Sequence, residues 1–149
     1  MKYYIDLRDN VDNLFIKALK DYCDLDISDI NIIYNENGKP LIENKDIYFS
    51  KSYSKDYVVI AFADTPIGAD MEFIKPFPNK LPNAFFTKNE IKYIGSDSKK
   101  LYEVWTLKEA ILKMNGSLLK NINQNNLKYK KSVIEELDNY FITIVVAKK

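Results

Sequence analysis

The chain reads PIGADME over residues 66–72, and the fold that we expect is built around this segment. After the Pro-Gly break, apolar residues alternate with acids, which predicts a strand over residues 69–73. Side chains two apart on a strand point to the same face, so Asp70 and Glu72 would lie side by side. Carboxylates held that close repel each other unless a cation offsets their charge. The pair indicates either a divalent-cation site or the solvent face of an edge strand, with Met71 facing the core.

The segments on either side of this stretch predict a mixed chain of strands and helices. Apolar runs and alternating patterns predict strands over 2–7, 30–34, 47–49, 57–62, 127–133 and 140–147. Apolar residues at helical spacing predict helices over 11–22, 87–94 and 99–115. Asn37-Gly38 marks a turn, and the proline-rich segment 75–83 is expected to be a loop. The fold class is therefore α+β, with antiparallel sheets.

A second group of charged residues lies in the stretch WTLKEAILK over residues 105–113. Glu109 and Lys113 are four residues apart on the expected helix, so they share a face. A carboxylate and an ammonium on one face could supply a metal ligand and a charge that neutralises phosphate. The alternative is an ordinary surface pair that stabilises the helix by roughly 0.3–0.5 kcal/mol.

Three further features carry weaker signals. Glu90 follows Thr87 by three residues, which is the spacing of a capping box and needs no catalytic role. Lys39 lies in a Gly-Lys-Pro turn. Residues 49–55 form a strand end rich in hydroxyls and lysines that could bind a phosphate. Each feature alone has a plain structural explanation, so only their order in the chain adds information.

The composition excludes several classes of function. The 149 residues are 46% hydrophobic and 13% aromatic, enough for a core, and contain no histidine and one cysteine, Cys23. Serine–histidine hydrolysis and histidine or thiolate metal sites are thus excluded, whereas carboxylates suit Mg²⁺ or Mn²⁺. A formal charge of +1 argues against a nucleic-acid partner. With no signal-like start and no run of roughly 20 apolar residues, we expect a cytoplasmic protein without a membrane partner.

Taken in order, these motifs closely resemble those of the 4'-phosphopantetheinyl transferase family, over about residues 38–116. The pair GxDxE and WxxKEAxxK is the specific part of the match, and the branch that activates peptide synthetases is the most similar. The resemblance implies one transferase domain over 1–149, built of two small α/β lobes with antiparallel sheets. The N-terminal lobe, about 1–65, would be shortened, and the C-terminal lobe would span about 66–149. The active site is expected in the cleft between them.

The resemblance also implies roles for individual residues. Asp70, Glu72 and Glu109 match the Mg²⁺ ligands, and Lys113 matches the lysine that faces the phosphates of coenzyme A. Glu90 matches the acid that helps to deprotonate the attacking serine or holds a metal-bound water. Three residues fall at positions that line the coenzyme A nucleotide: Lys39, Ser52 and Tyr53. Glu90, Lys113 and Glu109 would thus be the catalytic residues.

The implied reaction is Mg²⁺-dependent transfer of 4'-phosphopantetheine from coenzyme A to a serine of an apo acyl or peptidyl carrier protein, with release of 3',5'-ADP. A monomer is favoured over an oligomer. One departure concerns the coenzyme A site: Ser52-Tyr53-Ser54 stands where the family usually has Ser-His-Ser, and tyrosine carries no positive charge at neutral pH. The alternative function is a degenerate, non-catalytic relative that binds coenzyme A or a carrier protein.

Overall fold

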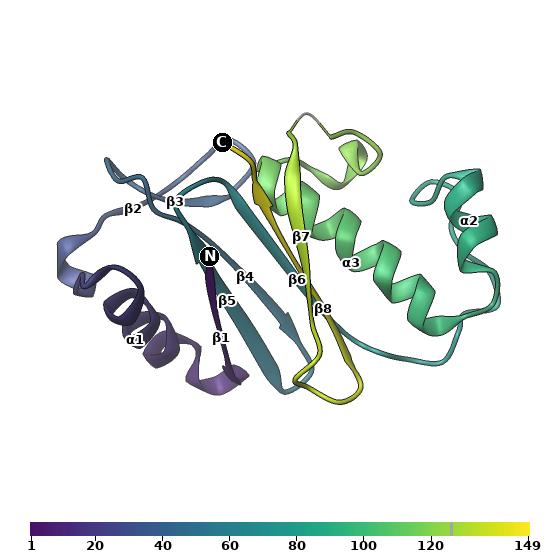
Figure 1. The fold of residues 1–149 in the computed structure, drawn as a ribbon, viewed down its shortest axis with the longest axis horizontal. Coiled ribbons are helices and arrows are strands. Elements are labelled where there is room, and N and C mark those ends of the chain that lie inside the picture. The colour runs from purple at the N-terminus through teal and green to yellow at the C-terminus, as the bar shows by residue number, and fades with distance from the viewer. Residues whose placement is uncertain (126) are drawn as a thin grey trace.

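Three antiparallel sheets and three α-helices make up the computed structural model, which describes residues 1–125 and 127–149 (Figure 1). The α-helices are α1 (Val11–Cys23), α2 (Lys88–Ile94) and α3 (Ser98–Asn115). The strands are β1 (Lys2–Leu7), β2 (Ile32–Tyr34), β3 (Pro40–Ile42), β4 (Tyr48–Ser54), β5 (Tyr57–Ala63), β6 (Ile67–Phe73), β7 (Tyr129–Ile134) and β8 (Tyr140–Ala147). Short 3-10 turns lie at Arg8–Asn10, Ile27–Asp29 and Leu119–Asn121.

The two three-stranded sheets lie between α1 on one side and α3 on the other (Figure 1). Their strand orders are β1-β5-β4 and β6-β8-β7, and β2 pairs with β3 in a separate ribbon. Strand β5 explains the arrangement, because its apolar run is buried on both faces. Val58, Ile60 and Phe62 pack in the cluster that includes α1, whereas Val59 and Ala61 pack against β6 and β8. A continuous apolar run suits such a central strand.

Helix α3 crosses closely over β6, and Gly68 makes this approach possible. A Cβ atom added at Gly68 would lie 1.8 Å from the carbonyl oxygen of Ala110 and 2.6 Å from the backbone nitrogen of Met114. Only glycine leaves room for a helix backbone at that distance. The glycine of the GxDxE motif therefore fixes how α3, with Glu109 and Lys113, lies over the acids of β6.

Serine hydroxyls join the two larger sheets along β4 and β6. The backbone N–H groups of Ala69, Met71 and Phe73 donate to the Oγ atoms of Ser50, Ser52 and Ser54, at 3.0, 3.0 and 2.7 Å. Serines two apart on β4 share one face, and alternate N–H groups of β6 point toward that face. These hydroxyls satisfy backbone donors that would otherwise be buried without partners.

Most expected elements are confirmed, with some differences in extent. The strand expected over residues 30–34 is shorter and spans only Ile32–Tyr34 (β2), and β3 was not expected at all. The segment 49–55, interpreted as a strand end, forms most of β4, because its serines are paired with β6 as described above. Among the described residues, no helix is both long and apolar enough to cross a membrane.

Candidate functional site

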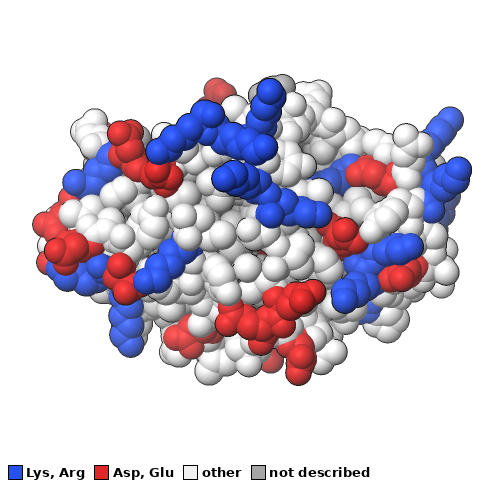
Figure 2. All heavy atoms as spheres, in the orientation of Figure 1, with Lys and Arg blue, Asp and Glu red and all other residues white. Residues whose placement is uncertain are grey.

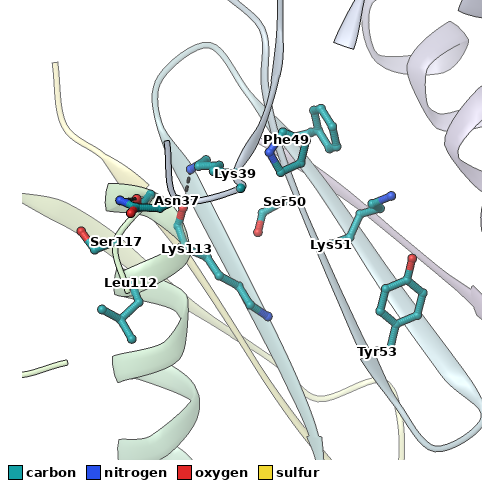
Figure 3. Close-up of a pocket in the computed structure, with 12 residues that line it drawn as sticks. Asn37, Lys39, Phe49, Ser50, Lys51, Tyr53, Leu112, Lys113 and Ser117 are labelled. Carbon is teal, nitrogen blue, oxygen red and sulfur yellow. Dashed lines mark hydrogen bonds between the residues drawn. The ribbon is translucent and has the colours of Figure 1, made fainter. Parts of the chain in front are cut away.

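A pocket of about 370 Å³ lies between β4, the turn before β3 and the C-terminal end of α3 (Figure 3). We call it the β4–α3 pocket, and it is lined by Asn37, Gly38, Lys39, Pro40, Phe49, Ser50, Lys51, Tyr53, Leu112, Lys113, Gly116 and Ser117. Of the four residues expected to contact coenzyme A, it brings together Lys39, Tyr53 and Lys113. Residues from distant parts of the chain thus meet around one cavity, with three lysines among them.

The ammonium group of Lys39 is bound to the end of α3. Its Nζ donates to the carbonyl oxygens of Ile67 at 3.1 Å and Met114 at 3.0 Å, and also to that of Lys113 (Figure 3). A positive charge at a helix C-terminus interacts favourably with the helix dipole. Burial lowers the pKa of Lys39 to about 8. The side chain therefore holds the turn before β3 against α3 and β6, in addition to lining the pocket.

Replacing Lys39 by methionine is expected to lower the free energy of unfolding by about 1–3 kcal/mol, because buried carbonyl oxygens lose their donor. Lys51→Met serves as the control. Its ammonium lies over the ring of Phe15, at 5.8 Å from the centroid, so its loss should cost about 0.5–1 kcal/mol. Urea unfolding followed by circular dichroism measures both values. Equal losses for the two variants would contradict the capping role of Lys39.

Tyr53 and Ser52 lie differently although they are adjacent on β4. Tyr53 is 39% exposed, and the guanidinium of Arg8 lies 5.0 Å from the centroid of its ring. Arg8 therefore brings a positive charge to the side chain of Tyr53. Ser52 is buried and does not line the β4–α3 pocket; its hydroxyl contacts β6 instead.

Asp70 is the most enclosed of the candidate acids. The residue is 4% exposed, so the solvent-face alternative for this strand is wrong. Its Oδ1 accepts hydrogen bonds from Lys113 Nζ at 2.9 Å and Ser52 Oγ at 3.1 Å. Its Oδ2 is buried and has no hydrogen-bond partner in the described part of the chain. Burial raises the pKa of Asp70, while Lys113 and Ser52 act in the opposite direction.

Glu72 and Glu109 are half-buried, and the charge of Asp70 affects the pKa of both. Burial, with Asp70 and Glu109 as further causes, raises the pKa of Glu72 to about 7. Burial and the charge of Asp70 also raise the pKa of Glu109. Glu109 and Lys113 do not form the ordinary surface pair that was the alternative, because Lys113 makes its ion pair with Asp70. Two acids from β6 and one from α3 thus repel one another electrostatically, which is the pattern of a cation site.

The chemistry of these residues fits a hard divalent cation. They offer carboxylate oxygens, which Mg²⁺ prefers, and one oxygen, Asp70 Oδ2, is buried without a partner. Over residues 1–125 and 127–149, however, no three side chains of the acid, histidine or cysteine type lie close enough to hold a metal ion as they stand. Lys113 provides the positive charge beside Asp70 in this arrangement. Binding of a cation would therefore require the half-buried glutamates to reorient toward Asp70.

The raised pKa of Glu72 predicts a pH dependence of stability in metal-free buffer. The pKa rises from 4.5 to about 7 on folding, so the folded chain holds this proton more tightly. The contribution of the Glu72 carboxyl to the free energy of unfolding is fully present when the carboxyl is protonated, below pH 4.5. It is lost as the pH rises toward 7. Glu72→Gln should match the wild type near pH 4 and be the more stable protein at pH 8. Urea unfolding in a chelator, with the exposed Glu36→Gln as control, measures this; a pH-independent difference would contradict it.

Glu90 is not joined to the three acids by any interaction among the described residues. It forms the expected capping box, accepting from the Thr87 N–H at 2.8 Å and donating its own N–H to Thr87 Oγ1 at 3.2 Å. It also forms an ion pair with Lys108. Burial alone would raise the pKa of Glu90, but these hydrogen bonds lower it. The carboxylate is therefore ionised at neutral pH.

Two sets of residues were not foreseen from the sequence. Lys108 is 7% exposed and links Glu90 to the side chain of Asn123, so it connects α2, α3 and the loop after Asn121. The serines of β4 form the junction described above. The sequence did contain an indication of the serine junction: serines at 50, 52 and 54 are two residues apart, which puts three hydroxyls on one face of a strand.

Comparison with known proteins identifies the family of this chain. Residues 66–141, a little over half of the chain, match the profile of the 4'-phosphopantetheinyl transferase superfamily. This chain belongs to that superfamily. The matched segment contains all three acids, Glu90 and Lys113.

Curated relatives extend the similarity beyond the matched segment. The 4'-phosphopantetheinyl transferase gsp of Aneurinibacillus migulanus is 35% identical over 99 residues, which cover 62% of this chain and 41% of that protein. The 4'-phosphopantetheinyl transferase Sfp of Bacillus subtilis (strain 168) is 36% identical over 98 residues, covering 62% and 44%. The 4'-phosphopantetheinyl transferase AcpT of Salmonella typhi is 31% identical over 94 residues, covering 57% and 49%. The alignments span less than half the length of each of these relatives.

Proposed function

We propose that the protein transfers 4'-phosphopantetheine from coenzyme A to a serine of an apo acyl or peptidyl carrier protein. The observation that carries the proposal is the Asp70–Lys113 pair, which lies where β6, β4 and α3 meet and whose lysine lines the β4–α3 pocket. The β4–α3 pocket is proposed as the coenzyme A site, in a cleft between lobes that divide near residue 65. Because one chain supplies both sides of this pocket, we propose a monomer.

The reaction forms one bond and breaks one. The serine oxygen of the carrier attacks the phosphorus that bears the pantetheine arm, and the bond from that phosphorus to the bridging oxygen breaks. The 3',5'-ADP leaves with the electron pair, and the serine proton passes to Glu90 directly or through water. Glu90 is ionised at neutral pH, as a proton acceptor must be. Such transfers depend mainly on positioning and on neutralising phosphate charge.

Different residues of this chain would position coenzyme A and neutralise its phosphate charge. Lys113 reaches from α3 toward the strands (Figure 3) and would stabilise the charge that develops on the departing phosphate. Tyr53, with Arg8 over its ring, and Lys39 would line the nucleotide end of the pocket. Asp70, Glu72 and Glu109 would hold Mg²⁺, which when bound neutralises charge on the diphosphate of coenzyme A.

The distribution of surface charge supports a protein partner of negative charge. One group of Lys and Arg lies in the upper centre of the face in Figure 2 and one group of Asp and Glu lies near the centre of its lower edge, while the two signs are mixed toward both ends. A positive region next to a negative one steers and orients an acidic partner. A carrier protein with an acidic recognition helix would have the matching charge.

The direct test mixes the full chain with an apo carrier protein, coenzyme A and MgCl₂ and weighs the carrier by mass spectrometry. We expect the carrier to gain the mass of phosphopantetheine, and to gain none when its serine is replaced by alanine or when a chelator replaces MgCl₂. The alternative is a non-catalytic relative. It would be favoured if several carriers gain no mass while calorimetric titration still shows coenzyme A binding.

A further inference from the structure

Ser52 differs from the other two serines that join β4 to β6. Ser50 and Ser54 each accept one backbone N–H from β6, and Ser52 does the same from Met71 at 3.0 Å. Ser52 Oγ also lies 3.1 Å from Asp70 Oδ1. Ser52 is therefore the one serine of the three that touches the buried acid.

The direction of this hydrogen bond follows from the chemistry of the hydroxyl. A serine hydroxyl has one proton to donate and two lone pairs that accept. The Met71 N–H occupies a lone pair, and an ionised carboxylate can only accept, so the single proton of Ser52 points to Asp70. Ser52 is 4% exposed, which keeps competing water away from this bond.

The two oxygens of Asp70 are consequently in different situations. Oδ1 accepts from Ser52 and from Lys113, whereas Oδ2 is buried and has no partner in the residues that the structure describes. Two donors on one oxygen fix the rotation of the carboxylate. The second oxygen is left facing the interior with its lone pairs unused, which is costly unless something binds there.

We propose that Ser52 is a positioning residue: it holds Asp70 Oδ1 so that Oδ2 is presented to the divalent cation. The inference rests on the proposed function only in taking Asp70 as a cation ligand. It gives Ser52 a task on the metal side of the site, distinct from lining the nucleotide pocket. Hydrogen bonds to metal ligands orient them, and their loss typically weakens metal binding by about 10–100-fold.

The test compares Ser52→Ala with Ser54→Ala in the full chain. Ser54 lies on the same face of β4 and accepts a similar hydrogen bond, from the N–H of Phe73 at 2.7 Å, and this bond does not involve Asp70. The affinity for Mn²⁺, a probe for Mg²⁺ sites, is measured by electron paramagnetic resonance of the free ion, and thermal unfolding is followed in parallel. We expect both variants to lose thermal stability, but only Ser52→Ala to raise the Mn²⁺ dissociation constant, by about tenfold or more. Ser52→Thr, which keeps the hydroxyl, should restore the affinity.

Every outcome bears on the inference. Equal weakening by both alanine variants would overturn it, since the loss would then come from a loosened sheet junction. Unchanged Mn²⁺ affinity in Ser52→Ala would overturn it while leaving the transferase proposal intact. A wild-type chain that binds no Mn²⁺ would overturn the cation site itself, and this inference with it. If Ser52→Ala does not fold, Ser52→Cys replaces it, with the same expected rise because a thiol is a weak donor.

Discussion

Replacing Asp70 by asparagine is expected to reduce phosphopantetheine transfer by about 10³-fold or more while the chain stays folded. Asp70 is the buried acid that pairs with Lys113 and whose charge reaches both Glu72 and Glu109. Asparagine keeps the shape and the acceptor oxygen for Ser52 but removes the charge that a cation requires. A loss of several kcal/mol in charge stabilisation corresponds to this factor, because each 1.36 kcal/mol changes the rate tenfold. Initial rates of carrier modification, measured by mass spectrometry, check the prediction.

Stability gives a second measure for the same variant. A ligand that binds only the folded chain raises the melting temperature, so MgCl₂ should stabilise the wild type and not Asp70→Asn. Asp64→Asn is the matched control, since Asp64 is an exposed acid that pairs with Lys149 at 2.7 Å. It should retain wild-type transfer. Retention of a tenth or more of the activity by Asp70→Asn would contradict the ligand role of Asp70.

The second large effect concerns Gly68, which we expect to tolerate no side chain. Gly68→Ala should lower the free energy of unfolding by about 3 kcal/mol or more, because the added methyl would lie 1.8 Å from the Ala110 carbonyl oxygen. The clash is with the backbone of α3, so no side-chain rotation relieves it. We expect the melting temperature to fall by roughly 10 °C. Transfer should also fall, because α3 carries Glu109 and Lys113.

Gly95→Ala separates this steric effect from the general cost of replacing glycine. Gly95 has a φ of +56° and a ψ of −114°, and nothing lies within 4 Å of an added Cβ, so its replacement costs only backbone strain, about 1–3 kcal/mol. Differential scanning calorimetry of both variants makes the comparison. A Gly68→Ala protein as stable as Gly95→Ala would show that α3 does not approach β6 as closely as described.

Periodicity and motif spacing predicted the framework of this molecule well. The apolar run of residues 57–62 predicted a strand, and its burial on both faces explains why no polar residue interrupts it. The capping box at Thr87 and Glu90 was predicted from two residues three apart, because such a cap depends only on local chain geometry. The order of the acidic and WxxKEAxxK motifs predicted the family.

Partners that lie far apart in the chain could not be predicted in the same way. The Lys39 ammonium binds the carbonyl oxygens of residues 113 and 114, which lie more than seventy positions away. The Gly-Lys-Pro turn motif does not predict this contact. Likewise, strand periodicity puts Ser52 on a face of β4 but does not say that Asp70 lies opposite. The pairing of Lys113 with Asp70, in place of Glu109, depends on how closely α3 crosses β6. That distance is set by the absence of a side chain at Gly68.

The most direct test of the account is a crystal structure of the chain grown with Mn²⁺ and coenzyme A, with anomalous diffraction used to locate the metal. We expect one anomalous peak in contact with carboxylate oxygens of Asp70, Glu72 and Glu109, with the diphosphate beside it and the nucleotide in the β4–α3 pocket. No peak at Asp70, or Glu109 directed away from Asp70 and Glu72 while coenzyme A is bound, would contradict the claim that these three acids share one cation.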